Sequence, residues 1–284
     1  MFNYLEPTYI KNFIQTALTE DVGDGDHTSL STIPPSAQGR AKLLVKDDGI
    51  LAGVALAKLI FEEVDKQLTV KTILEDGAVI KKGEIVLTVE GSSQSILKAE
   101  RLVLNCMQRM SGIATYTHSM VKLLEGTNTK LLDTRKTTPN FRLCEKWACK
   151  IGGAENHRYA LFDMILIKDN HVDYAGGIQN AINQANEYLK QTGRDLQIEI
   201  EVRNLTELQE VLAIGQVHRI MLDNFSYENL REAIRLIDGK YATEASGGIN
   251  ETTIRAYADC GVDYISCGAL THHVSSLDLS LKAY

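Results

Sequence analysis

The sequence predicts a mixed α/β protein, with an N-terminal α+β open-sandwich domain followed by an incomplete parallel β/α barrel. In the first part of the chain, short strand patterns are separated by glycine turns, which is typical of local antiparallel pairing. From residue 130 onward, strand patterns alternate with helical patterns, which predicts a parallel sheet. A complete barrel has eight strands. Six are evident here, so the barrel is expected to be incomplete.

The N-terminal domain, residues 1–114, is expected to begin with an amphipathic helix over residues 6–18. Pro7 suits the first turn of that helix, and apolar residues recur on one face. The acidic glycine loop at residues 20–26 has no glutamate at the closing position of a calcium loop, so a surface turn is expected. The other expected elements are strands at 37–45, 67–74 and 84–89, a helix at Val54–Val64, and a long helix at 95–125 with a break at Ser111-Gly112.

The C-terminal domain, residues 115–284, contains the repeated strand-then-helix pattern. Its last helix is expected to pack back on the N-terminal domain. The expected strands lie at 130–133, 164–168, 197–202, 219–222, 241–245 and Tyr264–Ser266, and the expected helices between them include 178–190, 205–212, 227–236 and 251–258.

Composition limits the classes of function. The net charge of -7 argues against a nucleic-acid partner, which would need a basic excess. The five cysteines form no CxxC pair, so buried reduced thiols are expected rather than disulfides or a zinc site. The N-terminus lacks the pattern of a signal peptide, and no apolar run is long enough to cross a bilayer. A cytoplasmic protein without a membrane partner is therefore expected.

Charged and hydroxyl side chains gather where the predicted strands end. Arg135 and Lys136 are adjacent cations, and such neighbours repel each other unless an anion lies between them. Active sites of β/α barrels lie at the carboxyl ends of the strands. The Gly247-Gly248 and Gly268-Ala269 pairs each precede a predicted helical turn, which favours a phosphate site. The six strand ends supply Arg135 and Lys136, Lys168, Glu201, Asp223, Ser246-Gly247-Gly248, and Cys267-Gly268-Ala269.

Several motifs together resemble the quinolinate phosphoribosyltransferase family, and the resemblance covers nearly the whole chain in order. The motifs are Asp133-Thr134-Arg135-Lys136-Thr137-Thr138-Pro139, Gly152-Gly153 with Asn156-His157-Arg158, Leu166-Ile167-Lys168-Asp169-Asn170-His171, Ile200-Glu201-Val202, Met221-Leu222-Asp223-Asn224, Glu244-Ala245-Ser246-Gly247-Gly248-Ile249 and Gly268-Ala269-Leu270-Thr271.

The resemblance implies phosphoribosyl transfer from phosphoribosyl pyrophosphate (PRPP) to quinolinate, with decarboxylation, in NAD biosynthesis. It implies catalytic roles for Lys136, Lys168, Glu201 and Asp223. The quinolinate ligands would be Thr134, Arg135, Lys136, His157, Arg158 and, from the partner subunit of a homodimer, Arg101. The PRPP ligands would be Lys168, Glu201, Asp223, Ser246, Gly247, Gly248, Cys267, Gly268 and Ala269. Magnesium is expected with PRPP near Glu201 and Asp223, without direct protein ligands.

Three alternatives follow from the residues alone. The first is a phosphoribosyltransferase acting on nicotinate or a related aromatic acid, which would need fewer cations. The second is a Schiff-base aldolase that uses Lys168, although the neighbouring Asp169 disfavours an uncharged amine. The third is a non-catalytic anion-binding protein, which would not need the acids Glu201 and Asp223.

Overall fold

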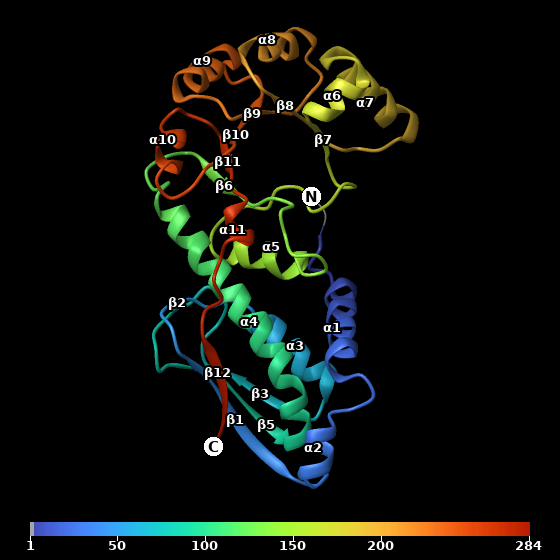
Figure 1. The fold of residues 1–284 in the computed structure, drawn as a ribbon, viewed down its shortest axis with the longest axis vertical. Coiled ribbons are helices and arrows are strands. Elements are labelled where there is room, and N and C mark those ends of the chain that lie inside the picture. The colour runs from blue at the N-terminus through green and yellow to red at the C-terminus, as the bar shows by residue number, and fades with distance from the viewer. Residues whose placement is uncertain (1–2) are drawn as a thin grey trace. The chain divides into compact units, whose positions relative to one another are not determined.

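Two sheets of different kinds organise the chain, one antiparallel and one parallel (Figure 1). The computed structural model describes residues 3–284. It divides into two compact units: a sandwich unit of residues 3–118, 136–153 and 270–284, and a barrel unit of residues 119–135 and 154–269. This partition differs from a linear division at residue 114, because two later segments of the chain belong to the sandwich unit.

The sandwich unit is built on a four-stranded antiparallel sheet in the order β12-β1-β5-β3, with a separate β2-β4 pair. Helix α1 packs against α3, and the predicted helix at Val54–Val64 is confirmed. The strands are β1 (Gln38–Val45), β2 (Gly49–Ile50), β3 (Thr69–Thr72), β4 (Val79–Ile80), β5 (Ile85–Ser92) and β12 (Leu279–Ala283), and the helices are α1 (Pro7–Val22), α2 (His27–Thr32), α3 (Val54–Val64), α4 (Ser93–Lys122) and α5 (Arg142–Ile151).

The last element of the chain is the strand β12, which follows the last helix. Strand β12 pairs with β1, and Leu281 stands opposite Leu43 in the register. Both leucines are buried, as are Leu279 and Val45, while the residues between them are more exposed. This alternation is that of a half-buried strand. The end of the chain therefore does return to the N-terminal part, but by strand pairing.

Helix α4 runs through Ser111-Gly112 without the expected break. Ser111 is fully buried, and its Oγ accepts from the backbone N–H of Ala52 at 2.9 Å. A Cβ at Gly112 would meet the backbone carbonyl oxygen of Ser275 at 2.2 Å. These two small residues let other backbone segments of the sandwich unit approach the helix closely.

The barrel unit contains six parallel strands in the order β6-β11-β10-β9-β8-β7, as predicted for an incomplete barrel. Figure 1 shows helices α6 to α10 on the outer side of these strands. The strands are β6 (Lys130–Leu132), β7 (Ile165–Ile167), β8 (Ile198–Val202), β9 (Arg219–Asp223), β10 (Ala242–Ser246) and β11 (Tyr264–Ser266), and the helices are α6 (Asp169–Ala175), α7 (Ile178–Thr192), α8 (Leu205–Ile214), α9 (Tyr227–Ile237), α10 (Ile254–Ala258) and α11 (Ala269–His272), the last of which spans the boundary between the units.

The edge strand β6 is extended by an isolated parallel bridge between Leu132 and Glu155. The backbone N–H of Glu155 donates to the carbonyl of Leu131 at 2.8 Å. The residues after this bridge, including His157 and Arg158, are thereby held beside the carboxyl end of β6.

The five cysteines are buried, as expected, and none of them forms a disulfide. Within residues 3–284, no helix combines the length and the apolar character needed to cross a membrane.

Candidate active site

Side chains alternate between the two faces of each barrel strand, so residues two apart in a strand point to the same face. On β8, Glu199 and Glu201 share a face, and Glu201 is the later of the two. In the register of β9 and β10, Asp223 stands opposite Ser246. The structure thus places the predicted residues of the barrel unit at or just after the carboxyl ends of their strands, except His157 and Arg158, which lie in the loop before β7.

Lys168 and Glu201 form an ion pair at the carboxyl ends of β7 and β8. The Nζ of Lys168 donates to Oε2 of Glu201 at 3.0 Å, and the lysine side chain is 46% exposed while the glutamate side chain is 8% exposed. A Schiff-base lysine needs an uncharged amine in apolar surroundings. This exposed, carboxylate-paired ammonium does not provide that, so the geometry disfavours the aldolase alternative.

Arg135 and Arg158 interact electrostatically within the barrel unit. Burial lowers the pKa of Arg158, and the positive charge of Arg135 lowers it further. The Nη1 of Arg158 donates to the backbone carbonyl of Met164 at 3.2 Å. Two guanidinium groups held within each other's field, one of them buried, form a site that favours an anion.

Asp133 connects the segments that carry these two arginines. Its carboxylate is fully buried and accepts from the backbone N–H of His157 at 2.8 Å and from Nδ2 of Asn156 at 2.6 Å. An acid at the end of a strand, next to a pair of cations, therefore has a structural explanation. It joins the end of β6 to the loop that follows Glu155.

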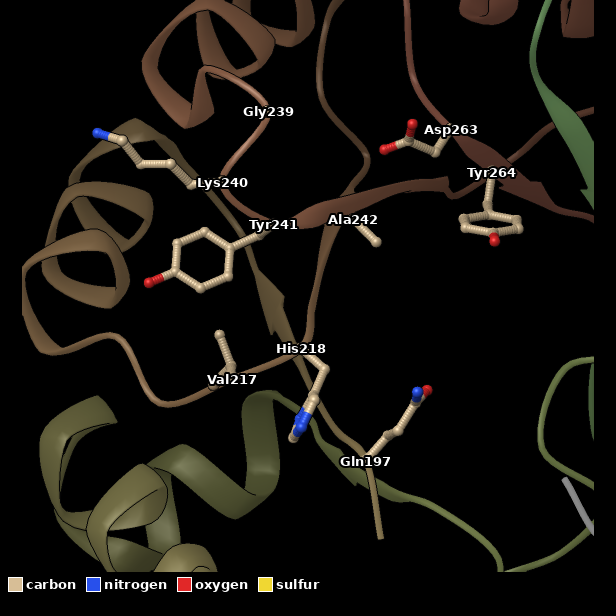
Figure 2. Close-up of a pocket in the computed structure, with 9 residues that line it drawn as sticks. All are labelled: Gln197, Val217, His218, Gly239, Lys240, Tyr241, Ala242, Asp263 and Tyr264. Carbon is tan, nitrogen blue, oxygen red and sulfur yellow. The ribbon is translucent and has the colours of Figure 1, made fainter.

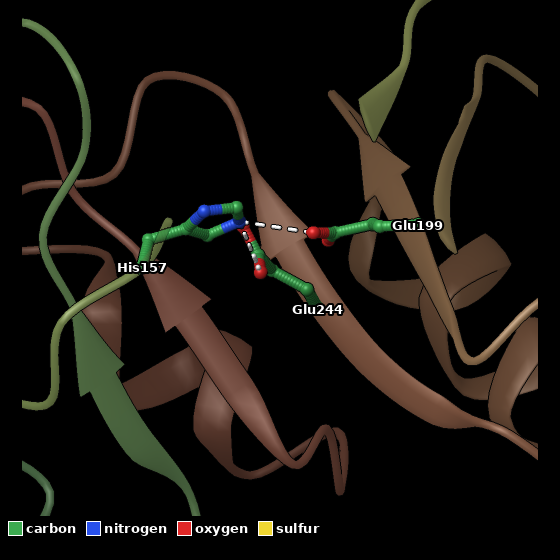
Figure 3. Close-up of side chains that lie close together, drawn as sticks. All are labelled: His157, Glu199 and Glu244. Atoms are coloured by element: carbon green, nitrogen blue, oxygen red, sulfur yellow. Dashed lines mark ion pairs between the residues drawn. The ribbon is translucent and has the colours of Figure 1, made fainter. Parts of the chain in front are cut away.

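His157 directs its Nε2 toward two buried glutamates, Glu199 and Glu244, as Figure 3 shows. Its Nδ1 accepts from the backbone N–H of Arg158 at 2.7 Å. Both ring nitrogens are thus engaged by protein atoms. A direct bond from His157 to a quinolinate carboxylate remains a prediction, and it would require this ring to change partners.

The Gly247-Gly248 turn follows β10, and both residues have positive φ angles, of 102° and 61°. A Cβ at Gly247 would lie 2.2 Å from Oδ1 of Asn224, so that position requires glycine. Helix α10 begins at Ile254 and has five residues, while α11 has four and begins at Ala269. Neither short helix supplies much of a dipole, so a phosphate site here depends on the glycine backbone. Cys267 is buried, and its Sγ lies 3.3 Å from the carbonyl of Ile249.

Lys136 belongs to the sandwich unit, where its loop is held by several side chains. Thr271 Oγ1 donates to the Lys136 carbonyl at 2.7 Å. The fully buried carboxylate of Glu145 accepts from the backbone N–H of Thr138 at 2.9 Å and from its Oγ1 at 3.0 Å. Glu145 is itself bound by Arg109 Nη2 at 3.0 Å. Arg101, also in this unit, is exposed on α4.

A hollow of about 580 Å³ lies at the opposite, amino ends of β8 to β11 (Figure 2). Its polar lining holds the strand ends together. His218 Nδ1 accepts from the backbone N–H of Ile198 at 2.9 Å, and Asp263 accepts from the backbone N–H of Thr243 at 2.8 Å. None of the predicted site residues lines it, so we assign it no part in the chemistry.

The acids that hold the cations in place were not predicted from the sequence. These are Asp133, Glu145, Glu199 and Glu244, all fully buried. Glu199 and Glu244 each stand two residues before a predicted site residue, Glu201 and Ser246, and so share its face of the strand. That spacing was the available signal.

Comparison with known proteins identifies the family. The chain matches the profile of the quinolinate phosphoribosyl transferase N-terminal domain over residues 26–111 and that of the C-terminal domain over residues 113–282. It is 46% identical to quinolinate phosphoribosyltransferase [decarboxylating] 1b of Nicotiana tabacum, over 97% of this chain and 83% of that protein. It is 39% identical to a probable nicotinate-nucleotide pyrophosphorylase [carboxylating] of Bacillus subtilis, over 96% of this chain and 92% of that protein.

A solved structure agrees. The crystal structure of NadC from Streptococcus pyogenes superposes with a TM-score of 0.91 at 40% identity, covering 99% of this chain and 98% of that one. Agreement in sequence and in fold over nearly the full length leaves no room for a non-catalytic anion-binding class. The chain belongs to the quinolinate phosphoribosyltransferase family.

Proposed function

We propose that the carboxyl ends of the barrel strands, with Lys136 and an arginine from a partner subunit, form the active site of a decarboxylating quinolinate phosphoribosyltransferase. In this reaction the ring nitrogen of quinolinate attacks the anomeric carbon of PRPP, and pyrophosphate leaves. The carboxylate beside that nitrogen is then lost as carbon dioxide, which gives nicotinate mononucleotide for NAD biosynthesis. The quaternised ring accepts the electron pair left by the carboxylate, so no separate electron sink is needed.

The observation that supports quinolinate most directly is the pair of arginines, Arg135 and Arg158. Each guanidinium can meet one carboxylate with two parallel hydrogen bonds. Burial and the field of Arg135 both lower the pKa of Arg158, and a bound dianion would relieve that repulsion. Thr134, Lys136 and His157 are the remaining ligands that we propose from the same subunit.

For PRPP, we propose Lys168, Glu201 and Asp223 at the sugar, with the glycine turns at the phosphates. The ribose passes through an oxocarbenium-like state when pyrophosphate leaves, and a carboxylate stabilises such a positive charge. Glu201 accepts a hydrogen bond from Lys168, which fixes the position of the carboxylate. The phosphate ligands proposed here are Ser246, Gly247, Gly248, Cys267, Gly268 and Ala269.

Magnesium fits this site as an ion that arrives with PRPP. Glu201 already accepts from Lys168, and Asp223 Oδ2 accepts from Nδ2 of Asn224 at 2.6 Å, so neither carboxylate is set up as a dedicated metal cage. Magnesium usually keeps several waters and binds through substrate phosphates. When bound, it neutralises charge on the leaving pyrophosphate.

We propose a homodimer in which Arg101 of one subunit completes the site of the other. Arg101→Ala and Glu201→Ala should each be inactive alone. If Arg101 acts on the partner's site, a mixed dimer contains one site with both lesions and one with neither, and activity reappears after subunit exchange. Absence of rescue, with exchange verified by a tag pull-down, would remove the shared-site arrangement.

The second candidate acceptor is nicotinate, which lacks the carboxylate that is lost. Two arginines in the site favour the dicarboxylate. In a competition assay with both acids present, we expect turnover of quinolinate alone. Equal turnover of the two would contradict the acceptor assignment.

We further propose a cytoplasmic location for this chain. Plant relatives carry names that place them in the chloroplast or the mitochondrion. Fractionation of the native host with an antibody to this chain would decide between a cytoplasmic and an organellar protein.

A further inference from the structure

A cluster of His157, Glu199 and Glu244 lies buried within the barrel unit (Figure 3). The Nε2 of His157 lies 3.0 Å from Oε2 of Glu199 and 3.3 Å from Oε2 of Glu244. The side chain of His157 is 6% exposed, and those of the two glutamates are fully buried. The glutamates come from β8 and β10, so the ring fills the space between strands that are not neighbours in the sheet.

A guanidinium also belongs to this cluster. Arg219 Nη1, from β9 between the two glutamate strands, donates to Oε2 of Glu244 at 3.1 Å. Burial opposes a charge on His157, whereas the carboxylates of Glu199 and Glu244 favour a proton on Nε2, the ring nitrogen that faces them. Burial and the charge of Glu244 raise the pKa of Glu199 to about 7.

Glu244 is the permanent anion of the cluster. Burial opposes its ionisation, yet the bonds to His157 and Ser266 and the charge of Arg219 lower its pKa to about 2. The three residues could also be arranged around a metal ion. The guanidinium of Arg219 beside Glu244 already supplies positive charge there, and Nδ1 of His157 accepts from the backbone N–H of Arg158, so a neutral ring with its proton on Nε2 fits the cluster better than a divalent cation.

The imidazole connects this cluster to the backbone of the proposed quinolinate site. Its Nδ1 accepts from the backbone N–H of Arg158, and the backbone N–H of His157 donates to the carboxylate of Asp133. The two glutamates thus hold the ring at Nε2, and Nδ1 of the ring holds the backbone of Arg158. A tilt of the ring would therefore move the backbone of Arg158 and, with it, the guanidinium.

We propose that Glu199 and Glu244 are positioning residues that act through His157 to place Arg158 for the quinolinate carboxylates. Neither glutamate touches substrate in this arrangement. The inference rests on the proposed function in one respect, which is that Arg158 binds quinolinate.

The test compares Glu199→Gln, Glu244→Gln and His157→Gln in the full-length protein. If the cluster positions Arg158, Glu199→Gln and Glu244→Gln each raise the KM for quinolinate about tenfold or more, as His157→Gln does. Their kcat and their KM for PRPP change much less. If the two glutamates have no positioning role, His157→Gln weakens binding while Glu199→Gln and Glu244→Gln bind quinolinate as the unaltered enzyme does. That second outcome would overturn the proposal.

A second measurement does not depend on activity. Nuclear magnetic resonance of the labelled imidazole should show a neutral ring with its proton on Nε2 in the unaltered protein, because Nδ1 accepts from the backbone N–H of Arg158. In Glu199→Gln the Nε2 signal should shift, because one of the two carboxylates that face it has gone. Glu232→Gln, in an exposed pair with Arg235, is the matched control and should change neither readout. An Nε2 signal that stays the same in Glu199→Gln would contradict the geometry.

Arg158→Lys separates the two proposals. If this variant binds quinolinate normally, the assignment of Arg158 as a ligand fails, whatever the glutamate variants do. If it loses quinolinate while the glutamate variants keep it, the ligand assignment stands and the positioning role is refuted.

Discussion

Glu145→Ala is expected to destabilise the protein strongly and to disturb the loop that carries Lys136. The carboxylate has no exposed surface, and it accepts four bonds: from Arg109 Nη2 at 3.0 Å and Nε at 3.3 Å, and from the N–H of Thr138 at 2.9 Å and its Oγ1 at 3.0 Å. Removing one partner of a buried ion pair costs about 3–5 kcal/mol, because the other charge loses its compensation. The same substitution releases Thr138, two residues after Lys136.

Urea unfolding followed by circular dichroism measures the loss of stability, and steady-state kinetics measures the effect of the disturbed loop on activity. We expect a fall of about 3–5 kcal/mol in the free energy of unfolding, together with reduced activity at temperatures where the variant stays folded. Glu145→Gln keeps the shape and part of the hydrogen bonding, so its loss should be smaller. Glu232→Ala removes an exposed acid from the Arg235 pair and should leave stability within experimental error. A Glu145→Ala protein as stable as the Glu232→Ala control would refute the reasoning.

Three further predictions follow from the geometry. Gly247→Ala should lower the free energy of unfolding by about 1–3 kcal/mol, because the φ of 102° and the nearby Asn224 both oppose a Cβ. Gly239→Ala, with a φ of 68° and nothing within 4 Å of the added Cβ, should lower it less. Equal unfolding midpoints for the two variants would contradict the steric argument. Burial and the charge of Glu244 raise the pKa of Glu199 to about 7, so this group contributes stability below pH 4.5 that is lost as the pH rises through about 7; unfolding across that range should show a decline of about 3 kcal/mol that Glu199→Gln removes, and parallel pH profiles of the two proteins would count against it. Glu201→Ala and Asp223→Ala should slow single-turnover chemistry more than they weaken quinolinate binding, because the proposed positive charge develops in the transition state; calorimetry that finds binding abolished, with chemistry intact at saturation, would overturn this role.

The barrel strands could be predicted to within one or two residues. Each is a short apolar run bounded by polar residues, as in Ile165–Ile167 followed by Lys168, and the helices between them carry a clear period. The order of β7 to β11 then follows the strand-then-helix rhythm, since each crossover places the next parallel strand nearby, whereas β6 pairs with β11 and not with β7. Strand β12 was not predictable in this way, because its partner β1 lies at the other end of the chain.

Helix α5 was missed because its pattern is obscured by charge. Glu145 and Lys146 are both fully buried within it, so its buried face does not appear apolar in the sequence. The break expected at Ser111-Gly112 has a similar origin. Small residues suggest a turn when the segments that pack against them are unknown.

The proposed site was predictable in its cations and much less so in the anions that hold them. Arg135 and Lys136 attract notice because like charges are adjacent in the sequence. Glu199 and Glu244 lie on two different strands, and their relation to His157 exists only after the sheet has formed. Pairings of this kind depend on strand register, which a single sequence does not contain.

The most direct test of the account follows the fate of one carboxylate. Quinolinate labelled in the carboxylate beside the ring nitrogen is incubated with the enzyme, PRPP and magnesium. We expect labelled carbon dioxide, pyrophosphate and unlabelled nicotinate mononucleotide to appear in equal amounts, and we expect omission of PRPP to abolish all three. Label retained in the nucleotide product, or product formed equally well from nicotinate, would contradict the assignment of this chain as a decarboxylating quinolinate phosphoribosyltransferase.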